Sequence, residues 1–245
     1  EIMPSLVGSE MCIRDRYNGE KYLAEQLDSI LLQVSEEDEL IISDDGSTDH
    51  TLEILRTYAA NYPQIQLLQG PGQGVIANFA FALTHTKGEV IFLADQDDVW
   101  LPNKVTTVTE YFETHPDIQV VISDLKIVDA DLQVTNPSYF KFRKVKPGFW
   151  RNAIKSGYIG AGMAFRQEMK NVILPIPPEV PMHDMWIGLL AARKKQTGLI
   201  KEPLVLYRRH GANVSPIITK TSFQQKLNWR VNLLKALHQR LKEQR

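Results

Sequence analysis

Apolar positions follow two different rhythms along the first half of the chain. One rhythm, an apolar residue every three or four positions, is typical of a helix with one buried face. It occurs in four segments, 20–34, 52–62, 76–83 and 105–112. The other, a short apolar run bounded by turn residues, is typical of a strand buried on both faces. These runs stand between the helical segments, at 39–45, 65–69, 89–94 and 118–123.

Strands that alternate with helices of this length predict an α/β fold with a Rossmann-like, mostly parallel sheet and helices on both faces. In such sheets ligands bind at the carboxyl ends of the strands. Acidic residues follow two of the predicted strands directly. Asp44 and Asp45 end the first run, and Asp95, Asp97 and Asp98 come after the run at 89–94. This placement is the first indication of a functional site.

The second half of the chain is less regular. The pattern predicts a hairpin around 129–131, a glycine-broken strand at 158–165, a helix beginning near 182 and a strand that runs into a loop at 199–215. A basic stretch interleaved with aromatic residues occupies 141–151. From Phe223 onward a basic amphipathic helix is predicted, with its apolar residues on one side: Leu227, Val231, Leu234 and Leu241.

Composition narrows the class of protein. With 245 residues, 43% of them hydrophobic, the chain can fill a sizeable core. A net charge of −1 argues against a dedicated nucleic-acid binder. Ten Lys/Arg against two Asp/Glu fall between 201 and 245, and such a basic tail indicates a surface that approaches phosphates or anionic lipid. The single cysteine, the lack of a spanning apolar run and the lack of a secretory signal predict a cytoplasmic protein, soluble or peripheral.

The acids after the run at 89–94 have two interpretations. Aspartate is a favoured helix cap, so Asp98 could cap the helix predicted from Pro102. That leaves Asp95 and Asp97, two carboxylates two residues apart, which suit Mg²⁺ or Mn²⁺ because these hard cations take carboxylate and phosphate oxygens. Taken alone, this D-x-D pattern is a weak signal of a metal site.

Five segments in order strengthen that signal: "YNGEKYLAEQLDSILLQ", "IISDDGSTDHT", "KGEVIFLADQDDVWLPNK", "MHDMW" and "LYRRHGANVS". Together they resemble the family 2 glycosyltransferases of GT-A fold, and within them the bacterial rhamnosyltransferase-like branch that builds surface polysaccharides. The resemblance covers about 17–216. It implies an inverting, metal-dependent hexosyltransferase that moves rhamnose or a similar sugar. The donor would be a dTDP- or UDP-sugar, and the acceptor a glycan or polyprenyl-linked glycan at the inner face of the plasma membrane.

The resemblance also implies roles for residues around the nucleotide. Tyr17 and Asn18 match the loop that packs beside the nucleotide, and Asn78 matches a position close to it. Asp44 and Asp45 match the acids that hold the base and ribose of the donor. From the residues alone, this acidic pair and the Gly-Ser after it are equally typical of a turn that caps a helix.

Further roles concern the diphosphate and the metal. The resemblance makes Asp97 a metal ligand and gives Asp95 contact with the ribose or the metal. His210 matches a residue that ligates the metal or touches phosphate, and Arg208 and Arg209 could pair with phosphate oxygens. A solvated basic loop explains the last three residues equally well.

Asp184 matches the general base, which takes the proton of the acceptor hydroxyl on the face of the sugar opposite the diphosphate. The alternative is that His183 and Asp184 simply begin a helix. The glycines at 160–162 match the wall of the acceptor pocket, and packing glycines in a strand are an equal alternative.

Residues 1–16 depart from the family pattern. The first strand of this fold is normally a Val/Ile run, whereas Pro4, Gly8, Glu10 and Arg14 would make a poor buried strand. We therefore interpret 1–16 as foreign to the domain, 17–216 as the glycosyltransferase domain and 217–245 as a C-terminal helix. That helix either lies on an anionic membrane or docks on the domain by its leucines.

Two rival functions are an inactive or nucleotide-binding remnant of the fold, which the unusual N-terminus suggests, and a sugar-nucleotide pyrophosphorylase. The latter usually carries a Gly-rich basic loop after its first strand, and none follows Tyr17.

Overall fold

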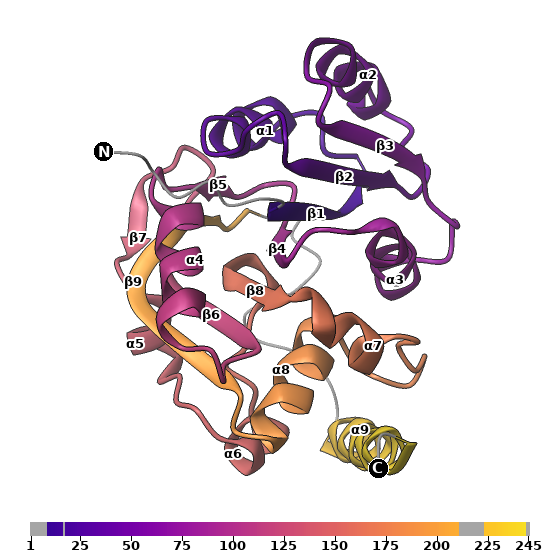
Figure 1. The fold of residues 1–245 in the computed structure, drawn as a ribbon, viewed down its shortest axis with the longest axis vertical. Helices are drawn as coiled ribbons and strands as arrows, with labels where there is room; N and C mark the ends of the chain where they lie inside the picture. The colour runs from indigo at the N-terminus through magenta and orange to yellow at the C-terminus, as the bar shows by residue number, and fades with distance from the viewer. Residues whose placement is uncertain (1–8, 17, 211–222, 244–245) are drawn as a thin grey trace.

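The computed structural model describes residues 9–16, 18–210 and 223–243. Within them the strands form one sheet in the order β3-β2-β1-β4-β8-β6-β9-β5, with β7 paired to β6 (Figure 1). The strands are β1 (Ser9–Arg16), β2 (Glu39–Asp44), β3 (Ile65–Gln69), β4 (Val90–Ala94), β5 (Val99–Trp100), β6 (Val120–Val128), β7 (Val134–Asn136), β8 (Met163–Arg166) and β9 (Thr197–Arg208). The α/β fold class is confirmed.

Strands β1 to β4 pair in parallel, and β6 pairs in parallel with β9. The short strand β8 lies antiparallel between β4 and β6 and so joins the two parallel parts. β6 and β7 form the hairpin predicted around 129–131. The sheet is therefore mixed, and its parallel β3-β2-β1-β4 part carries both acidic clusters at the carboxyl ends of its strands.

Helices cover both faces of this parallel part. α1 (Leu23–Leu31) and α2 (Thr51–Asn61) lie on one side of β1–β3 and α3 (Val75–His85) on the other (Figure 1). Residues of β2 and β4 are buried along nearly their whole length, which explains their unbroken apolar runs. The remaining helices are α4 (Lys104–Thr114), α5 (Tyr139–Arg143), α6 (Phe149–Ile154), α7 (Lys170–Ile173), α8 (His183–Arg193), α9 (Phe223–Glu243) and two 3₁₀ turns, Gly160–Gly162 and Gln167–Met169.

The N-terminal stretch forms a strand, contrary to expectation. Its backbone runs as β1 in the centre of the parallel part, where Cys12 is in register with Ile41 of β2 and Leu93 of β4. A strand ladder is built by backbone N–H and C=O groups, which every residue except proline supplies in full. The ladder between two neighbouring strands can therefore form despite an unfavourable side-chain pattern. That residues 1–16 are foreign to the domain stays a prediction.

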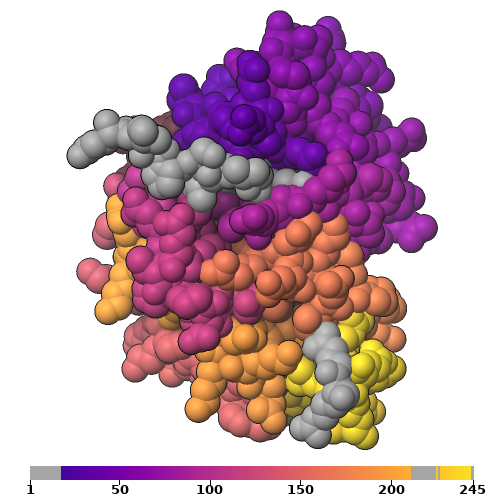
Figure 2. Space-filling model, viewed as in Figure 1, coloured from indigo at the N-terminus to yellow at the C-terminus, as the bar shows by residue number. Residues whose placement is uncertain are grey.

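α9 docks on the body of the protein by a different face from the one expected. Leu233 and Leu237 are buried, whereas Leu227, Val231 and Leu234 of the predicted stripe are exposed. The buried guanidinium of Arg240 fixes this register, because it donates hydrogen bonds to the carbonyl oxygens of residue 172, in α7, and of residues 174 and 175, which follow it. Figure 2 shows α9 at the end of the molecule opposite α2. Among the helices described, none combines the length and the apolar character that crossing a membrane requires.

Candidate functional site

The acidic pair at the end of β2 holds two loops. The buried Asp44 carboxylate accepts hydrogen bonds from the backbone N–H groups of Gly46 and Ser47, at 3.0 Å each. Asp45 accepts from the N–H groups of Gly72 and Gly74, at 2.7 and 2.9 Å. The turn interpretation therefore describes Asp44 well, and Asp45 ties the glycine-rich loop before α3 to the strand end. Contact of either acid with a nucleotide stays a prediction.

Two asparagines expected near the nucleotide brace the same region. Asn18, in a left-handed conformation with φ of 54°, accepts from the N–H of Thr48 at 3.0 Å. Asn78 is completely buried and donates to the carbonyl oxygen of Ser43 at 3.0 Å. Asn78 therefore holds the end of β2 in this conformation, and its closeness to a nucleotide stays a prediction. Tyr17 lies outside the described residues.

The loop after β4 presents its acids in different environments. Asp97 is within 3.0 Å of His210, measured from Oδ2 to Nε2, and both side chains are largely buried. Burial, and then the neighbouring Asp95, raise the pKa of Asp97. The backbone carbonyl of Asp95 accepts a hydrogen bond from the side chain of Gln26 in α1. α1 therefore holds this loop in place, with Asp97 facing the segment that follows β9.

Asp98 is buried and does not cap the helix that follows, which corrects the prediction that it would cap a helix beginning near Pro102. α4 begins at Lys104 with Asn103 before it, and Asp98 instead accepts the N–H of Arg208 at 2.9 Å. Burial raises the pKa of Asp98 well above its usual range, and burial lowers that of Lys104 to about 7. The Lys104 ammonium donates to the carbonyl oxygen of Ala161 at 2.9 Å and lies 3.8 Å from the centre of the Trp100 ring. It links the loop after β4 to the glycine turn.

The two arginines at the end of β9 have different surroundings. Arg208 is buried, and its guanidinium donates to the carbonyl oxygens of Asp97 and Ala130, at 2.8 and 2.6 Å, and pairs with Glu25. These bonds hold the guanidinium inside the protein, and contact of Arg208 with a phosphate stays a prediction. Arg209 donates to the hydroxyl of Tyr207 at 2.9 Å and lines a pocket, so it is the arginine placed to meet an anion.

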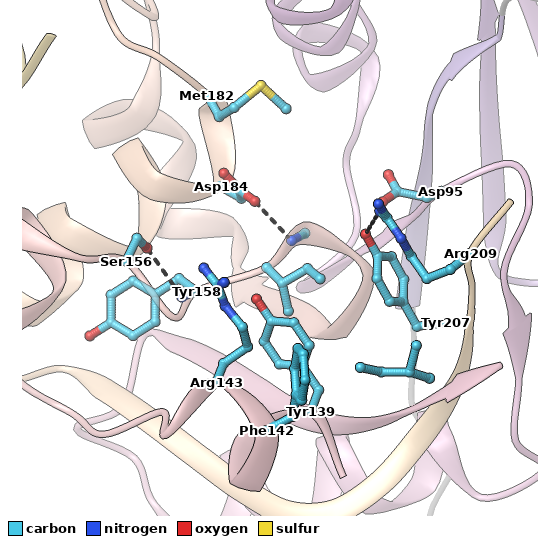
Figure 3. Close-up of a pocket in the computed structure, with 13 residues that line it drawn as sticks. Asp95, Tyr139, Phe142, Arg143, Ser156, Tyr158, Met182, Asp184, Tyr207 and Arg209 are labelled. Atoms are coloured by element: carbon cyan, nitrogen blue, oxygen red, sulfur yellow. Dashed lines mark hydrogen bonds between the residues drawn. The ribbon is translucent and has the colours of Figure 1, made fainter. Parts of the chain in front are cut away.

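This pocket joins the acids of two distant segments. It has a volume of about 200 Å³, and Asp95 and Asp184 lie on opposite sides of it (Figure 3). Asp184, in the first turn of α8, accepts hydrogen bonds from the N–H groups of Gly160 and Met185, at 3.2 and 2.6 Å. The 3₁₀ turn at 160–162 therefore does form a wall of the pocket beside this carboxylate.

Aromatic and basic side chains complete the pocket. Tyr139 and Tyr207 pack edge to face, with ring centroids 6.3 Å apart. Arg143 also lines the pocket and points toward Asp184 (Figure 3). Flat rings beside carboxylates and guanidinium groups can stack on a sugar and bind its hydroxyls. Of this set, sequence reasoning named Asp95, Asp184 and Arg209, and it noted the segment around Arg143 only as a basic stretch.

The residues near Asp97 fit a divalent cation that is shared with a substrate. Within the described part of the chain, no three His, Cys, Asp or Glu side chains converge as a complete metal site. Mg²⁺ and Mn²⁺ commonly use one or two protein carboxylates and take further oxygens from substrate phosphates. Asp97, Asp95 and the adjacent His210 are suited to such a partial set, since the Asp97 carboxylate and the His210 ring already lie within 3.0 Å of each other.

Comparison with known proteins identifies relatives of this chain. Residues 16–173 match the model of glycosyl transferase family 2. An uncharacterized glycosyltransferase of Nostoc is 30% identical over 82% of the chain and 65% of its own length, and uncharacterized mycobacterial proteins are 30% identical over 58% of theirs. A dTDP-rhamnosyl transferase of Shigella flexneri is 28% identical over 81% of the chain and 74% of its own length. The chain thus spans about three fifths of the length of the Nostoc and mycobacterial relatives.

Solved structures share the fold. TarS of S. aureus in complex with UDP-GlcNAc aligns over 92% of this chain and 66% of its own, with a TM-score of 0.65 and 18% identity. A mannosyltransferase from Pyrobaculum calidifontis in complex with GDP-Man and Mn²⁺ aligns over 94% of this chain and 64% of its own, with a TM-score of 0.63 and 19% identity.

Proposed function

Because the chain belongs to glycosyl transferase family 2 and has the GT-A fold, we propose that it is an inverting glycosyltransferase. It moves a sugar from a nucleotide-diphosphate donor to a hydroxyl of a glycan or lipid-linked glycan in cell-surface polysaccharide synthesis. The observation that carries this proposal is that Asp95 and Asp184 line opposite sides of the same pocket. Donor and acceptor can meet there with a carboxylate on each side.

The donor side is formed by the ends of β2, β4 and β9. Asp45 and Asp95 face the nucleoside, with Asp44 holding the turn beside them. Arg209 and His210 face the diphosphate. Asp97, with Asp95 and His210, would hold a divalent cation, which would supply positive charge to offset the negative charge of the diphosphate as it leaves. The segment at 211–216, the end of the resemblance to the family, falls outside the described residues, which resume at 223.

Asp184 is the base in this proposal. Its two carboxylate oxygens each accept a backbone N–H, which fixes the orientation of the group toward the pocket. An acceptor hydroxyl bound between Asp184 and the donor sugar gives its proton to this carboxylate as it attacks the anomeric carbon, and the bond from that carbon to the diphosphate breaks. A positioned general base contributes about 10²–10⁴-fold in rate.

For the donor we propose dTDP-rhamnose or a UDP-sugar. The Shigella relative is described as a dTDP-rhamnosyl transferase, and TarS has been solved with UDP-GlcNAc. Calorimetry with UDP and with dTDP, each with and without Mn²⁺, tests nucleotide binding. A panel of sugar nucleotides, monitored by release of nucleoside diphosphate, then identifies the donor. We expect metal-dependent binding of at least one nucleotide. If neither UDP nor dTDP bound, the result would favour an inactive remnant.

The role of Asp184 is tested by Asp184→Asn, with Asp131→Asn in the exposed β6–β7 hairpin as the matched control. The Asp184 variant should bind nucleotide and Mn²⁺ as the wild type does and transfer sugar about 10²–10⁴-fold more slowly. Normal transfer by Asp184→Asn would show that another group takes the proton. Release of pyrophosphate from a sugar phosphate and a nucleoside triphosphate would instead favour a pyrophosphorylase.

We further propose peripheral contact with the inner face of the plasma membrane. Trp150 and Ile154 of α6 are 71% and 65% exposed, and Arg230 of α9 donates a hydrogen bond to the carbonyl oxygen of Ile154. The exposed Leu227 and Val231 of α9 therefore belong to the same region as these two side chains. Flotation with phosphatidylglycerol vesicles should recover the protein, and Trp150→Ser with Leu227→Ser should abolish recovery. Equal recovery of the double variant would contradict membrane contact through this face.

A further inference from the structure

A second hollow, of about 300 Å³, lies next to the proposed acceptor pocket. Its walls come from the α5–α6 connection and from α6 with the residues that follow it. Five of the nine residues that line it are cationic: Arg143, Lys144, Lys146, Arg151 and Lys155. We call this hollow the basic groove. It accounts for the basic stretch at 141–151, to which the sugar-transfer chemistry assigns no role.

The positive charge of the basic groove is not balanced by protein carboxylates. No aspartate or glutamate lines it, and in the described part of the chain none of its five cations belongs to an ion pair. Four of the five side chains are exposed, and Arg143 is half-buried. Like charges held this close repel one another, and the repulsion is relieved when an anion binds among them.

The walls of the groove are held by fixed contacts. Arg151 donates to the carbonyl oxygen of Lys144 at 3.0 Å. The buried side chain of Asn152 donates to the carbonyl oxygens of Lys146 and Gly148, at 3.0 and 2.8 Å, and accepts the N–H of Gly157 at 3.0 Å. These bonds tie the α5–α6 connection to the residues after α6. The cations therefore project from a braced backbone.

Arg143 connects the groove with the acceptor side of the site. It lines both hollows, and on the pocket side it points toward Asp184 (Figure 3). The donor side, with Asp95 and Arg209, lies across the same pocket from Arg143. An anion bound in the groove would therefore belong to the acceptor, which is the molecule whose hydroxyl Asp184 deprotonates. It would be distinct from the diphosphate of the donor.

We propose that the basic groove is a binding subsite for a phosphate group of the acceptor. A phosphate monoester carries about −1.5 to −2 charge at neutral pH and three acceptor oxygens, which suit a cluster of several cations better than one carboxylate does. Arginine forks bind phosphate in a bidentate way, and lysines add point charges. The role of this phosphate as part of an acceptor rests on the proposed function; the phosphate site itself does not.

Direct binding tests the subsite without any need for transfer activity. Two probes, farnesyl diphosphate and α-D-glucose 1-phosphate, are titrated by calorimetry into the metal-free protein in EDTA, and glucuronate serves as the carboxylate probe. The test variant is Lys146→Gln with Arg151→Gln. Lys194→Gln with Lys201→Gln removes the same charge from exposed positions elsewhere, and Arg209→Gln removes the cation on the donor side. Urea unfolding of each variant verifies that it folds.

We expect the groove variant to bind the phosphate probes at least tenfold more weakly, with the surface control and Arg209→Gln within about twofold of the wild type. Tighter binding of farnesyl diphosphate indicates a lipid-linked source of the phosphate, and tighter binding of glucose 1-phosphate indicates a sugar phosphate. Unchanged affinity in the groove variant, loss in Arg209→Gln instead, or equal affinity for glucuronate would overturn the proposal. Calorimetry of UDP with Mn²⁺ on the same samples reports separately on the donor site.

Discussion

The neighbouring residues Arg208 and Arg209 should respond to mutation in opposite ways. Arg208→Lys keeps the positive charge but removes the planar fork that reaches Asp97, Ala130 and Glu25 at once. Arg209→Gln removes a charge that faces the pocket and leaves the backbone bond from its N–H to the carbonyl oxygen of Val128. The first change should lower stability, and the second should lower affinity for nucleotide.

The size of each effect follows from the contacts. A lysine at position 208 can replace one of the three bonds, and each lost bond from a charged donor is worth about 1.5–3 kcal/mol. Glu25 is 48% exposed, so its ion pair with Arg208 adds at most about 1 kcal/mol. Arg208→Lys should therefore lower the free energy of unfolding by about 2–4 kcal/mol. Arg209→Gln loses one partly exposed bond to Tyr207, which is worth about 1 kcal/mol or less.

Two assays on the same samples separate these effects. Urea unfolding, monitored by tryptophan fluorescence, gives the change in stability. Calorimetry with UDP and Mn²⁺ gives the change in affinity, which for Arg209→Gln should be about 10–100-fold if one charge-assisted contact with the diphosphate is lost. If Arg208→Lys were as stable as the wild type, or if Arg209→Gln bound UDP and Mn²⁺ normally, the assignment of the two arginines would be refuted.

Three further changes test the surroundings of the site. Lys104→Met removes the donor to the carbonyl oxygen of Ala161 and leaves that buried acceptor unpaired, which should lower the free energy of unfolding by about 1–3 kcal/mol, measured in urea. Gly188→Ala places a Cβ within 3.0 Å of three ring carbons of Tyr158, so overpacking of about 1–3 kcal/mol should reduce the melting temperature. A hydrogen bond to Glu20 raises the pKa of His50, so the stability that this pair adds is full below pH 6.5 and is lost as pH rises through the raised pKa. His50→Gln should therefore differ from the wild type in urea only at the acidic end.

The fold could be predicted from the sequence wherever one physical requirement determined the pattern. β2 and β4 are buried on both faces, so nearly all of their residues are apolar and the runs are visible. β8 has only four residues, and its antiparallel place between β4 and β6 depends on partners far away in the sequence. α9 has apolar residues on more than one side, and the bonds of Arg240 to the carbonyl oxygens at the end of α7 and just after it decide which side is buried.

The site could be predicted as a list of chemical groups but not as a set of roles. The acids at strand ends were recognisable because sheet topology brings those ends together. The hydrogen-bond partners of these acids could not be predicted. Asp44 and Asp45 are adjacent in the sequence, yet they accept N–H groups from two different loops. Arg208 and Arg209 are likewise adjacent in the sequence, and the alternation of side chains along an extended segment directs them to opposite sides.

The crowding of three carboxylates after β4 is accommodated by a different environment for each. Asp98 is buried next to Lys104 and accepts a backbone N–H, so its charge or its proton is balanced inside the protein. Asp95 borders the pocket, and Asp97 pairs with His210, while burial and the neighbouring Asp95 raise the pKa of Asp97. The carboxylates of Asp95 and Asp184 thus border the pocket, whereas the cations of the basic groove line a neighbouring hollow. A donor that needs a cation and an acceptor that carries a phosphate would be drawn to different hollows, and Arg143 lines both of them.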